Sequence, residues 1–221
     1  ILQPQEPSVL MDNQIYAHVG KDISCNLGSL NMQKALESPD LAVTVETAVR
    51  ALTEVSDMSY IDAVPTVAEG NRRSRAIGLG VMNVHGSFVK NHMFYGDEES
   101  LDRVNMYFYT ILFHAVRASN RIAVERGESF DGFESSKYAS GEFFERFVNP
   151  EFVFAPQTEK VAEIFKNIWV PSAEDWAVLA EEVRVGGMYN SHLMAIPPTG
   201  SISYVNHSTP SSLPVTSTIL E

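Results

Sequence analysis

The placement of two short strand-like segments in a helix-rich chain is the feature that most restricts the fold. Ile23–Leu30 alternates apolar with small polar residues, and Ala76–Met82 is an apolar run that contains Gly78 and Gly80. Both patterns are typical of β-strands. Longer helical patterns separate and follow them, and short strands separated by long helices favour an α/β fold.

Helical periodicity and capping residues predict the longer elements. The spacing indicates helices over 40–59 and 98–126, the second starting near Asp97 and ended by Gly127. The apolar face expected for the second helix is Leu101, Val104, Tyr107, Phe108, Ile111, Leu112, Ala115 and Ile122. Shorter helices are expected over 140–147, 158–168 and 172–185, strands over Tyr16–Val19 and Ser191–Ile196, and loops over 62–75 and 206–217. No repeat or long linker divides the chain, so residues 1–221 are expected to lie in one domain.

Charge and composition restrict the partners. The chain has 16 Lys and Arg against 28 Asp and Glu, a net charge of −12. A protein with this negative charge repels a polyanion such as DNA or RNA, so we expect no nucleic-acid partner. No apolar run approaches the roughly 18 residues that cross a bilayer, and the N-terminal residues do not have the pattern of a signal peptide. These patterns, with a single cysteine, predict a cytoplasmic protein without a membrane partner.

Gly78-x-Gly80, with Gly86 further on, partly matches a dinucleotide-binding fingerprint. Asn83 occupies the position of the third glycine, and the required acidic partner pattern is missing. The pattern therefore favours close packing of a strand against a helix over a nucleotide site.

The segment from Pro197 to Ser203 has two interpretations. A strand runs into two prolines, which are followed by a hydroxyl, a glycine and another hydroxyl. Such a loop can turn several N–H and O–H groups toward one phosphate without a net positive charge. An ordinary Pro-Gly turn with self-capping hydroxyls would have the same residues. The residues alone leave both interpretations open.

The remaining reactive side chains give weak signals. A lone cysteine such as Cys25 is more often an inert buried residue than a redox thiol, and a disulfide would need a cysteine outside this sequence. The six histidines have no metal-ligand spacing, so no metal site is expected. The basic cluster over 72–75 fits ion pairing better than an anion site.

Five segments, taken together and in this order, resemble the catalytic large subunit of ribonucleotide reductase, most closely class Ib. They span nearly the whole chain, and the resemblance identifies it as an internal segment of that subunit. The matching segments are Val19–Asn31, Ala76–Asn83, Arg117–Ala123, Ser136–Phe144 and Pro197–Tyr204.

The resemblance implies a fold, an activity and a site. The fold would be a helix-rich α/β part of the family's ten-stranded barrel. The activity would be radical-based reduction of ribonucleoside diphosphates to deoxyribonucleotides, as part of a larger assembly. Cys25 would be one of two redox thiols, with its disulfide partner outside this chain. The substrate phosphates would be held by Pro198, Thr199, Gly200, Ser201 and Ile202.

The resemblance also implies partners: the remaining segments of the large subunit, a small subunit with the metal-radical cofactor, and a glutaredoxin- or thioredoxin-like reductant. It places the radical cysteine and the effector-binding loops outside this sequence, so no cofactor is expected on this chain. A different hypothesis is a catalytically incompetent fragment that binds reductase subunits or nucleotide. After Thr209 the sequence departs from the family pattern, so the resemblance makes no prediction for the packing beyond the phosphate loop.

Overall fold

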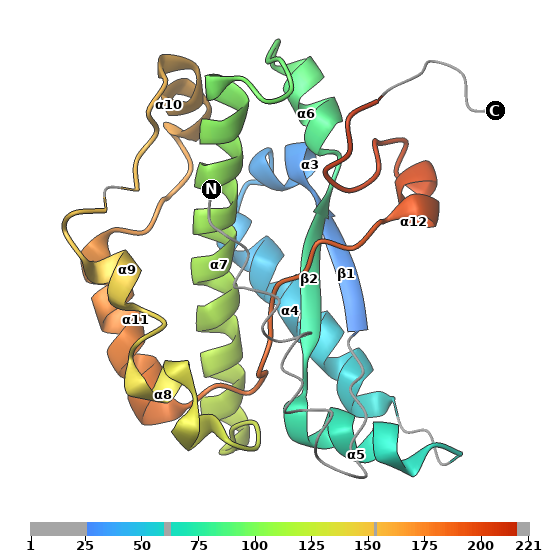
Figure 1. Ribbon diagram of the computed structural model, residues 1–221, viewed down its shortest axis with the longest axis vertical. Helices are drawn as coiled ribbons and strands as arrows, with labels where there is room; N and C mark the ends of the chain where they lie inside the picture. Colours follow the sequence, from blue (N-terminus) through green and yellow to red (C-terminus); the bar gives the residue numbers. More distant parts are fainter. Residues whose placement is uncertain (1–25, 60–62, 153, 216–221) are drawn as a thin grey trace.

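The computed structural model describes residues 26–59, 63–152 and 154–215. These residues form two strands and a larger set of helices around them (Figure 1). In chain order the elements are β1 (Asn26–Asn31), α3 (Met32–Leu36), α4 (Leu41–Met58), α5 (Pro65–Ser74), β2 (Ile77–Met82), α6 (Val84–Lys90), α7 (Glu98–Arg126), η1 (Phe133–Ser135), α8 (Lys137–Ser140), α9 (Glu145–Val148), α10 (Glu159–Phe165), α11 (Ala173–Gly186) and α12 (Gly200–Val205).

The sheet is parallel, as short strands joined through helices require. β1 and β2 pair from Asn26↔Ile77 to Asn31↔Met82, and every residue of β2 is buried. The two predicted strands are therefore confirmed over the residues that the structure describes. The expected strand over Tyr16–Val19 lies outside them.

A third extended segment pairs with the other edge of β2. The N–H of Ile77 donates to the His192 carbonyl at 3.0 Å, and the N–H of Leu79 donates to the Leu193 carbonyl at 2.7 Å. The expected strand over Ser191–Ile196 is present here only as a short parallel bridge at Met194. A Cβ on Gly80 would lie 2.4 Å from Pro197 Cδ. Gly80 thus permits a close approach, but the approaching segment is extended backbone and not the expected helix.

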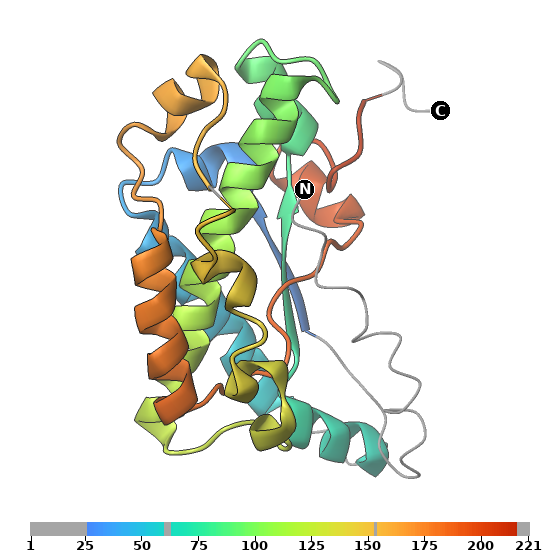
Figure 2. The same cartoon turned by 60° about the vertical axis from the view of Figure 1, so that its left-hand side comes forward.

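α7 lies between the strands and the outer helices α8 to α11 (Figures 1 and 2). Its predicted ends are confirmed: Asp97 Oδ1 accepts the Ser100 N–H at 2.7 Å, and Gly127 closes the helix at φ 67°. Within the expected apolar face, Tyr107, Ile111, Ala115 and Ile122 are buried, whereas Leu101 is largely exposed. On α11, the fully buried Trp176 stacks on Phe147 of α9 with ring centroids 4.1 Å apart.

The prediction of a loop over 62–75 was wrong, because α5 occupies Pro65–Ser74. Pro65 is at a first-turn position, where proline is tolerated. Asn71 of this helix is buried against α4, where its Nδ2 donates to the Ser56 carbonyl at 2.7 Å. This tertiary contact stabilises a helix that the local pattern disfavours.

The prediction of a single helix over 140–147 was also wrong. Gly141 adopts φ 85° and separates two four-residue helices, α8 and α9. The short helices α3, α6 and α12 have no counterpart in the sequence analysis. The helices α4, α10 and α11 match their predicted segments, with Asp40, Thr158 and Ser172 as N-caps. No helix in the described ranges is long and apolar enough to span a membrane.

Candidate functional site

The loop predicted to bind phosphate lies beside the carboxyl ends of β1 and β2 (Figures 1 and 2). It follows the extended segment that pairs with β2, whose Ala195 N–H donates to the Leu79 carbonyl at 3.2 Å. In parallel α/β sheets, ligands commonly bind at the carboxyl ends of the strands. The loop therefore lies at the edge of the sheet where ligands of such folds commonly bind.

The loop turns at Thr199, whose φ is 53°. A left-handed conformation is rare for a β-branched residue and costs about 1 kcal/mol. The turn allows α12 to start at Gly200, and the Thr199 carbonyl accepts the N–H of Ser203 at 3.0 Å. Pro198, Gly200, Ser201 and Ile202 are exposed, whereas Thr199 is only 8% exposed.

The exposed part of the loop carries several hydrogen-bond donors. Within the ranges that the structure describes, no acceptor is found for the backbone N–H groups of Gly200, Ser201 and Ile202 or for the Ser201 hydroxyl. Backbone N–H groups and a hydroxyl can bind an anion without a positively charged side chain. The loop thus has the donor chemistry for a phosphate on a chain of net charge −12.

Residues Thr209–Ser211, hereafter the strap, connect this loop to the ends of the strands. The backbone N–H of Ser211 donates to Thr199 Oγ1 at 2.6 Å. The Thr209 carbonyl accepts the N–H of Asn83 at 2.8 Å, directly after β2. The sequence analysis expected an irregular tail here and left its packing open, but the strap is hydrogen-bonded to both the loop and the strand end.

Asn83 and the strap also close the start of α6. Asn83 has a φ of 63°, and its Nδ2 donates to Asn31 Oδ1 at 3.0 Å. Thr209 Oγ1 accepts the Gly86 N–H at 3.2 Å, and the Ser211 carbonyl accepts the Val84 N–H at 3.4 Å. Sequence reasoning did not select these residues; the available signal was an asparagine between a strand and a helix, together with the Ser/Thr-rich tail.

Cys25, the predicted redox thiol, lies outside the described residues. The residue that follows it, Asn26, begins β1 and pairs with Ile77. The structure therefore describes the strand that begins at the residue after Cys25.

The basic cluster over 72–75 forms ion pairs, as the sequence analysis favoured. Arg72 and Arg73 both pair with Glu69, and Arg75 pairs with Glu128 at 2.8 Å. These three arginine side chains form ion pairs with neighbouring carboxylates on this chain.

The histidines of the described ranges form no cluster with Asp or Glu that could hold a metal ion. Burial lowers the pKa of His192 to about 4. Burial, together with the nearby cationic Arg117, lowers the pKa of His114 to about 4 as well. Both imidazoles are therefore neutral near pH 7, and His114 Nδ1 lies 3.1 Å from Arg117 Nη2.

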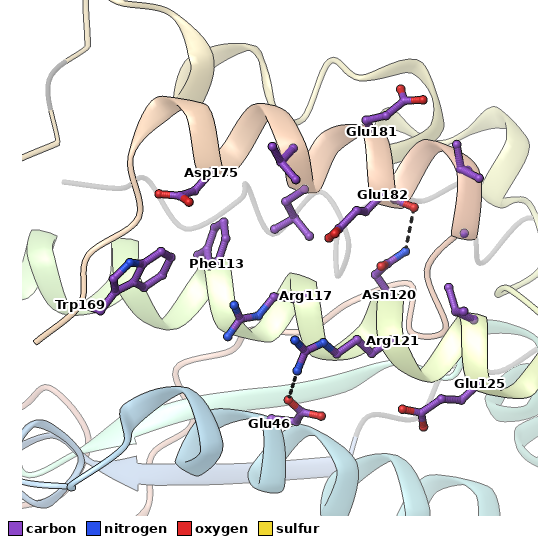
Figure 3. Close-up of a pocket in the computed structure, with 15 residues that line it drawn as sticks. Glu46, Phe113, Arg117, Asn120, Arg121, Glu125, Trp169, Asp175, Glu181 and Glu182 are labelled. Atoms are coloured by element: carbon purple, nitrogen blue, oxygen red, sulfur yellow. Dashed lines mark hydrogen bonds and ion pairs between the residues drawn. The ribbon is translucent and has the colours of Figure 1, made fainter.

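An open groove of about 930 Å³ lies between α7 and α11, on the opposite side of α7 from α12 (Figures 2 and 3). Most of the polar groups drawn in it already have partners. Arg121 pairs with Glu46 at 2.7 Å, and Asn120 Nδ2 donates to the Glu182 and Gly187 carbonyls at 3.1 and 2.8 Å. Asn120 thus satisfies carbonyls at the end of α11, and these contacts join helices.

Comparison with known proteins places the fold in a family. The model of the family described as ribonucleotide reductase, barrel domain, matches residues 1–221. The described part is a helix-rich segment with a small parallel sheet, which agrees with part of an α/β barrel. The chain belongs to this ribonucleotide reductase barrel family, and the predicted fold class is confirmed.

Curated proteins that are similar to this chain share one name, the alpha subunit of ribonucleoside-diphosphate reductase. The chain is 42% identical over 224 residues to the ribonucleoside-diphosphate reductase subunit alpha of Mycoplasma pneumoniae, in an alignment that covers 99% of this chain and 31% of that protein. It is 40% identical to the subunit alpha of Bacillus subtilis, covering 100% of this chain and 31% of that protein. The NrdEB subunit alpha of Bacillus subtilis is 41% identical, and the alignment covers 20% of it. The chain therefore spans about a third or less of these relatives.

Proposed function

We propose that this chain is a component of a ribonucleoside-diphosphate reductase, which reduces ribonucleoside diphosphates to deoxyribonucleoside diphosphates for DNA synthesis. The observation that carries the proposal is the similarity of about 40% identity along the whole chain to proteins named as the alpha subunit of that enzyme. The chain supplies part of the barrel around the substrate, and the other segments of the large subunit supply the rest.

The proposed site has two parts on this chain. Pro198, Thr199, Gly200, Ser201 and Ile202 form the loop that holds the substrate diphosphate. The free N–H groups over Gly200–Ile202 and the Ser201 hydroxyl support this role, because they are neutral donors in an acidic protein. Cys25 is the second part, as one of the two thiols that reduce the ribose.

The reaction balances with one dithiol for each deoxyribonucleotide. A thiyl radical on a cysteine outside this chain removes the 3′ hydrogen atom of the ribose and returns it at the end. The 2′ hydroxyl leaves as water. Cys25 and its partner thiol lose two electrons and two protons and become a disulfide; one hydrogen remains on C2′ and the other leaves in the water.

The proposed partners follow from this division of roles. A small subunit with the metal-radical cofactor generates the thiyl radical, and no cofactor is assigned to this chain. A glutaredoxin- or thioredoxin-like protein reduces the disulfide after each turnover. Nucleotide effectors bind to the large subunit outside this segment.

The proposal is tested with Cys25→Ser in the assembled large subunit, with the small subunit and a dithiol reductant present. Multiple-turnover reduction of a ribonucleoside diphosphate should be lost while substrate binding is retained. Full activity in this variant would overturn the role of Cys25.

A second measurement tests the alternative of an incompetent fragment. The chain is purified gently from its own source, and its native mass and every co-purifying polypeptide are determined. Association with, or continuity into, a polypeptide that carries the radical cysteine supports the reductase. A lone, partly unfolded chain of 24.5 kDa would support the fragment instead.

A further inference from the structure

The hydroxyl of Thr199 faces the strap and not the open side of the loop. It accepts the Ser211 N–H at 2.6 Å, and the residue is 8% exposed, whereas Gly200 and Ser201 are exposed. Among the described residues, the loop therefore has an exposed side whose donors have no acceptor and an inner side that is hydrogen-bonded to the strap.

Thr199 and Ser211 both have left-handed backbones, with φ of 53° and 45°. Neither is a glycine, so neither conformation is favoured locally. Such conformations persist where surrounding contacts hold them. The Ser211–Thr199 hydrogen bond and the Ser203 N–H bond to the Thr199 carbonyl, at 3.0 Å, are contacts of this kind.

The strap is itself anchored at the end of β2. Asn83 and Thr209 exchange two hydrogen bonds: Asn83 N–H to the Thr209 carbonyl at 2.8 Å, and Thr209 N–H to Asn83 Oδ1 at 3.3 Å. The packing is close, because a Cβ on Gly86 would lie 2.0 Å from Asn83 Oδ1. The strap is thus hydrogen-bonded to the strand end at Thr209 and to Thr199 at Ser211, and its own backbone joins these two contacts.

We propose that Thr199 is a positioning residue, through which the strap sets the height and angle of the phosphate loop above the strands. This inference rests on the proposed function and deepens it. The substrate diphosphate contacts the N–H groups over Gly200–Ile202 and the Ser201 hydroxyl, and Thr199 acts through the backbone that presents them. Thr209 and Asn83 then affect substrate affinity without touching the substrate.

The test is a double-mutant cycle of Thr199→Val and Thr209→Val in the complete, assembled reductase. Each change removes one hydroxyl and keeps the shape of the side chain. Thr199→Val removes the acceptor of the Ser211 N–H, and Thr209→Val removes the acceptor of the Gly86 N–H, which holds the strap to α6. We expect each variant to raise KM for the ribonucleoside diphosphate about fivefold, the effect of about one neutral hydrogen bond, with kcat little changed. The double variant should resemble Thr199→Val alone, and Thr199→Ser should restore wild-type KM.

Thr158→Val is the matched control. Thr158 caps α10, which has seven residues like α6, and its hydroxyl accepts the Val161 N–H at 3.4 Å. It should leave KM unchanged. Asn83→Gly is a second strap variant that keeps a left-handed backbone and removes the side-chain amide; it should raise KM like Thr209→Val.

Wild-type KM with Thr209→Val and Asn83→Gly, combined with a raised KM for Thr199→Val, would mean direct contact of Thr199 with substrate and would overturn the inference. So would additive effects in the double variant. Failure of the wild-type assembly to bind or reduce any ribonucleoside diphosphate would instead overturn the proposed function itself.

Discussion

Ser119 and Asn190 exchange two hydrogen bonds in the core: the Ser119 hydroxyl donates to Asn190 Oδ1 at 2.9 Å and accepts the Asn190 N–H at 3.0 Å. The Asn190 amide also donates to Thr53 Oγ1 at 3.1 Å and to the Arg75 carbonyl at 2.9 Å. One buried side chain therefore joins α4, α7 and the start of β2 to the segment that leads to the phosphate loop.

Replacing Asn190 by Ala should lower the free energy of unfolding by about 3 kcal/mol, because several buried polar groups lose their partners at once. Urea unfolding of the large subunit, followed through the tryptophans, measures this. Asn167→Ala, at an exposed position, is the control and should change the value by less than about 0.5 kcal/mol. Equal stability of the two variants would contradict the assigned role of Asn190.

Gly80→Ala should separate the third extended segment from β2. The added Cβ would lie 2.4 Å from Pro197 Cδ and 2.5 Å from the Ala195 carbonyl oxygen, so the backbone before the phosphate loop must shift. We expect a loss of stability of about 1–3 kcal/mol and weaker substrate binding. Thermal unfolding and substrate titration measure the two effects.

Gly28→Ala is the comparison for that variant. Its Cβ would meet only the end of the Leu52 side chain, at 3.2 Å, and that side chain can move. A smaller effect on stability is expected. If Gly80→Ala binds substrate as wild type does, the close approach does not position the loop.

The long elements were predictable from the sequence because their signals are local. α7 has its Asp97 cap and its closing Gly127 within the segment itself. α5 was not predictable, because Pro65 and Gly70 indicate a loop and the contact of Asn71 with Ser56 stabilises the helix from another element.

The same distinction applies to the candidate site. The composition of the loop over Pro197–Ser203 fits either a phosphate site or an ordinary turn, and in the part of the chain that the structure describes the backbone N–H groups of Gly200–Ile202 have no acceptor. The packing of the strap against the end of β2 was not predictable, because the hydrogen bond between Asn83 and Thr209 joins residues 126 positions apart. No local pattern indicates which distant hydroxyl will cap a helix.

Stability should fall as the pH decreases from about 6.5, in part through His114. Burial lowers the pKa of this imidazole from 6.5 to about 4. Between these values the unfolded chain takes up a proton that the folded chain does not, so stability is present above pH 6.5 and is lost progressively down to about pH 4. The slope for one such group approaches 1.4 kcal/mol per pH unit.

His114→Leu should reduce this slope between pH 5.0 and 6.5, and denaturant unfolding at several pH values measures it. Asn167→Ala, at an exposed position, changes no titratable group and should leave the slope as in the wild type. An unchanged slope in His114→Leu would mean that this histidine is protonated in the folded protein.

Ser201→Ala should weaken binding of the substrate diphosphate about fivefold, because one neutral donor is lost from the exposed side of the loop. Its effect on stability should be small, since the Ser201 side chain is exposed. Equilibrium titration with a ribonucleoside diphosphate measures the affinity. Ser135→Ala, also exposed and located in η1, is the control; equal affinities of the two variants would remove Ser201 from the site.

The most direct test of the central claim is the state of Cys25 after turnover. The assembled enzyme is allowed to reduce a ribonucleoside diphosphate without an external reductant and is then quenched, alkylated and mapped by peptide mass spectrometry. We predict that Cys25 forms a disulfide with a cysteine outside residues 1–221, with about one disulfide for each deoxyribonucleotide formed. Deoxyribonucleotide formation with Cys25 still a free thiol in every molecule would contradict the account.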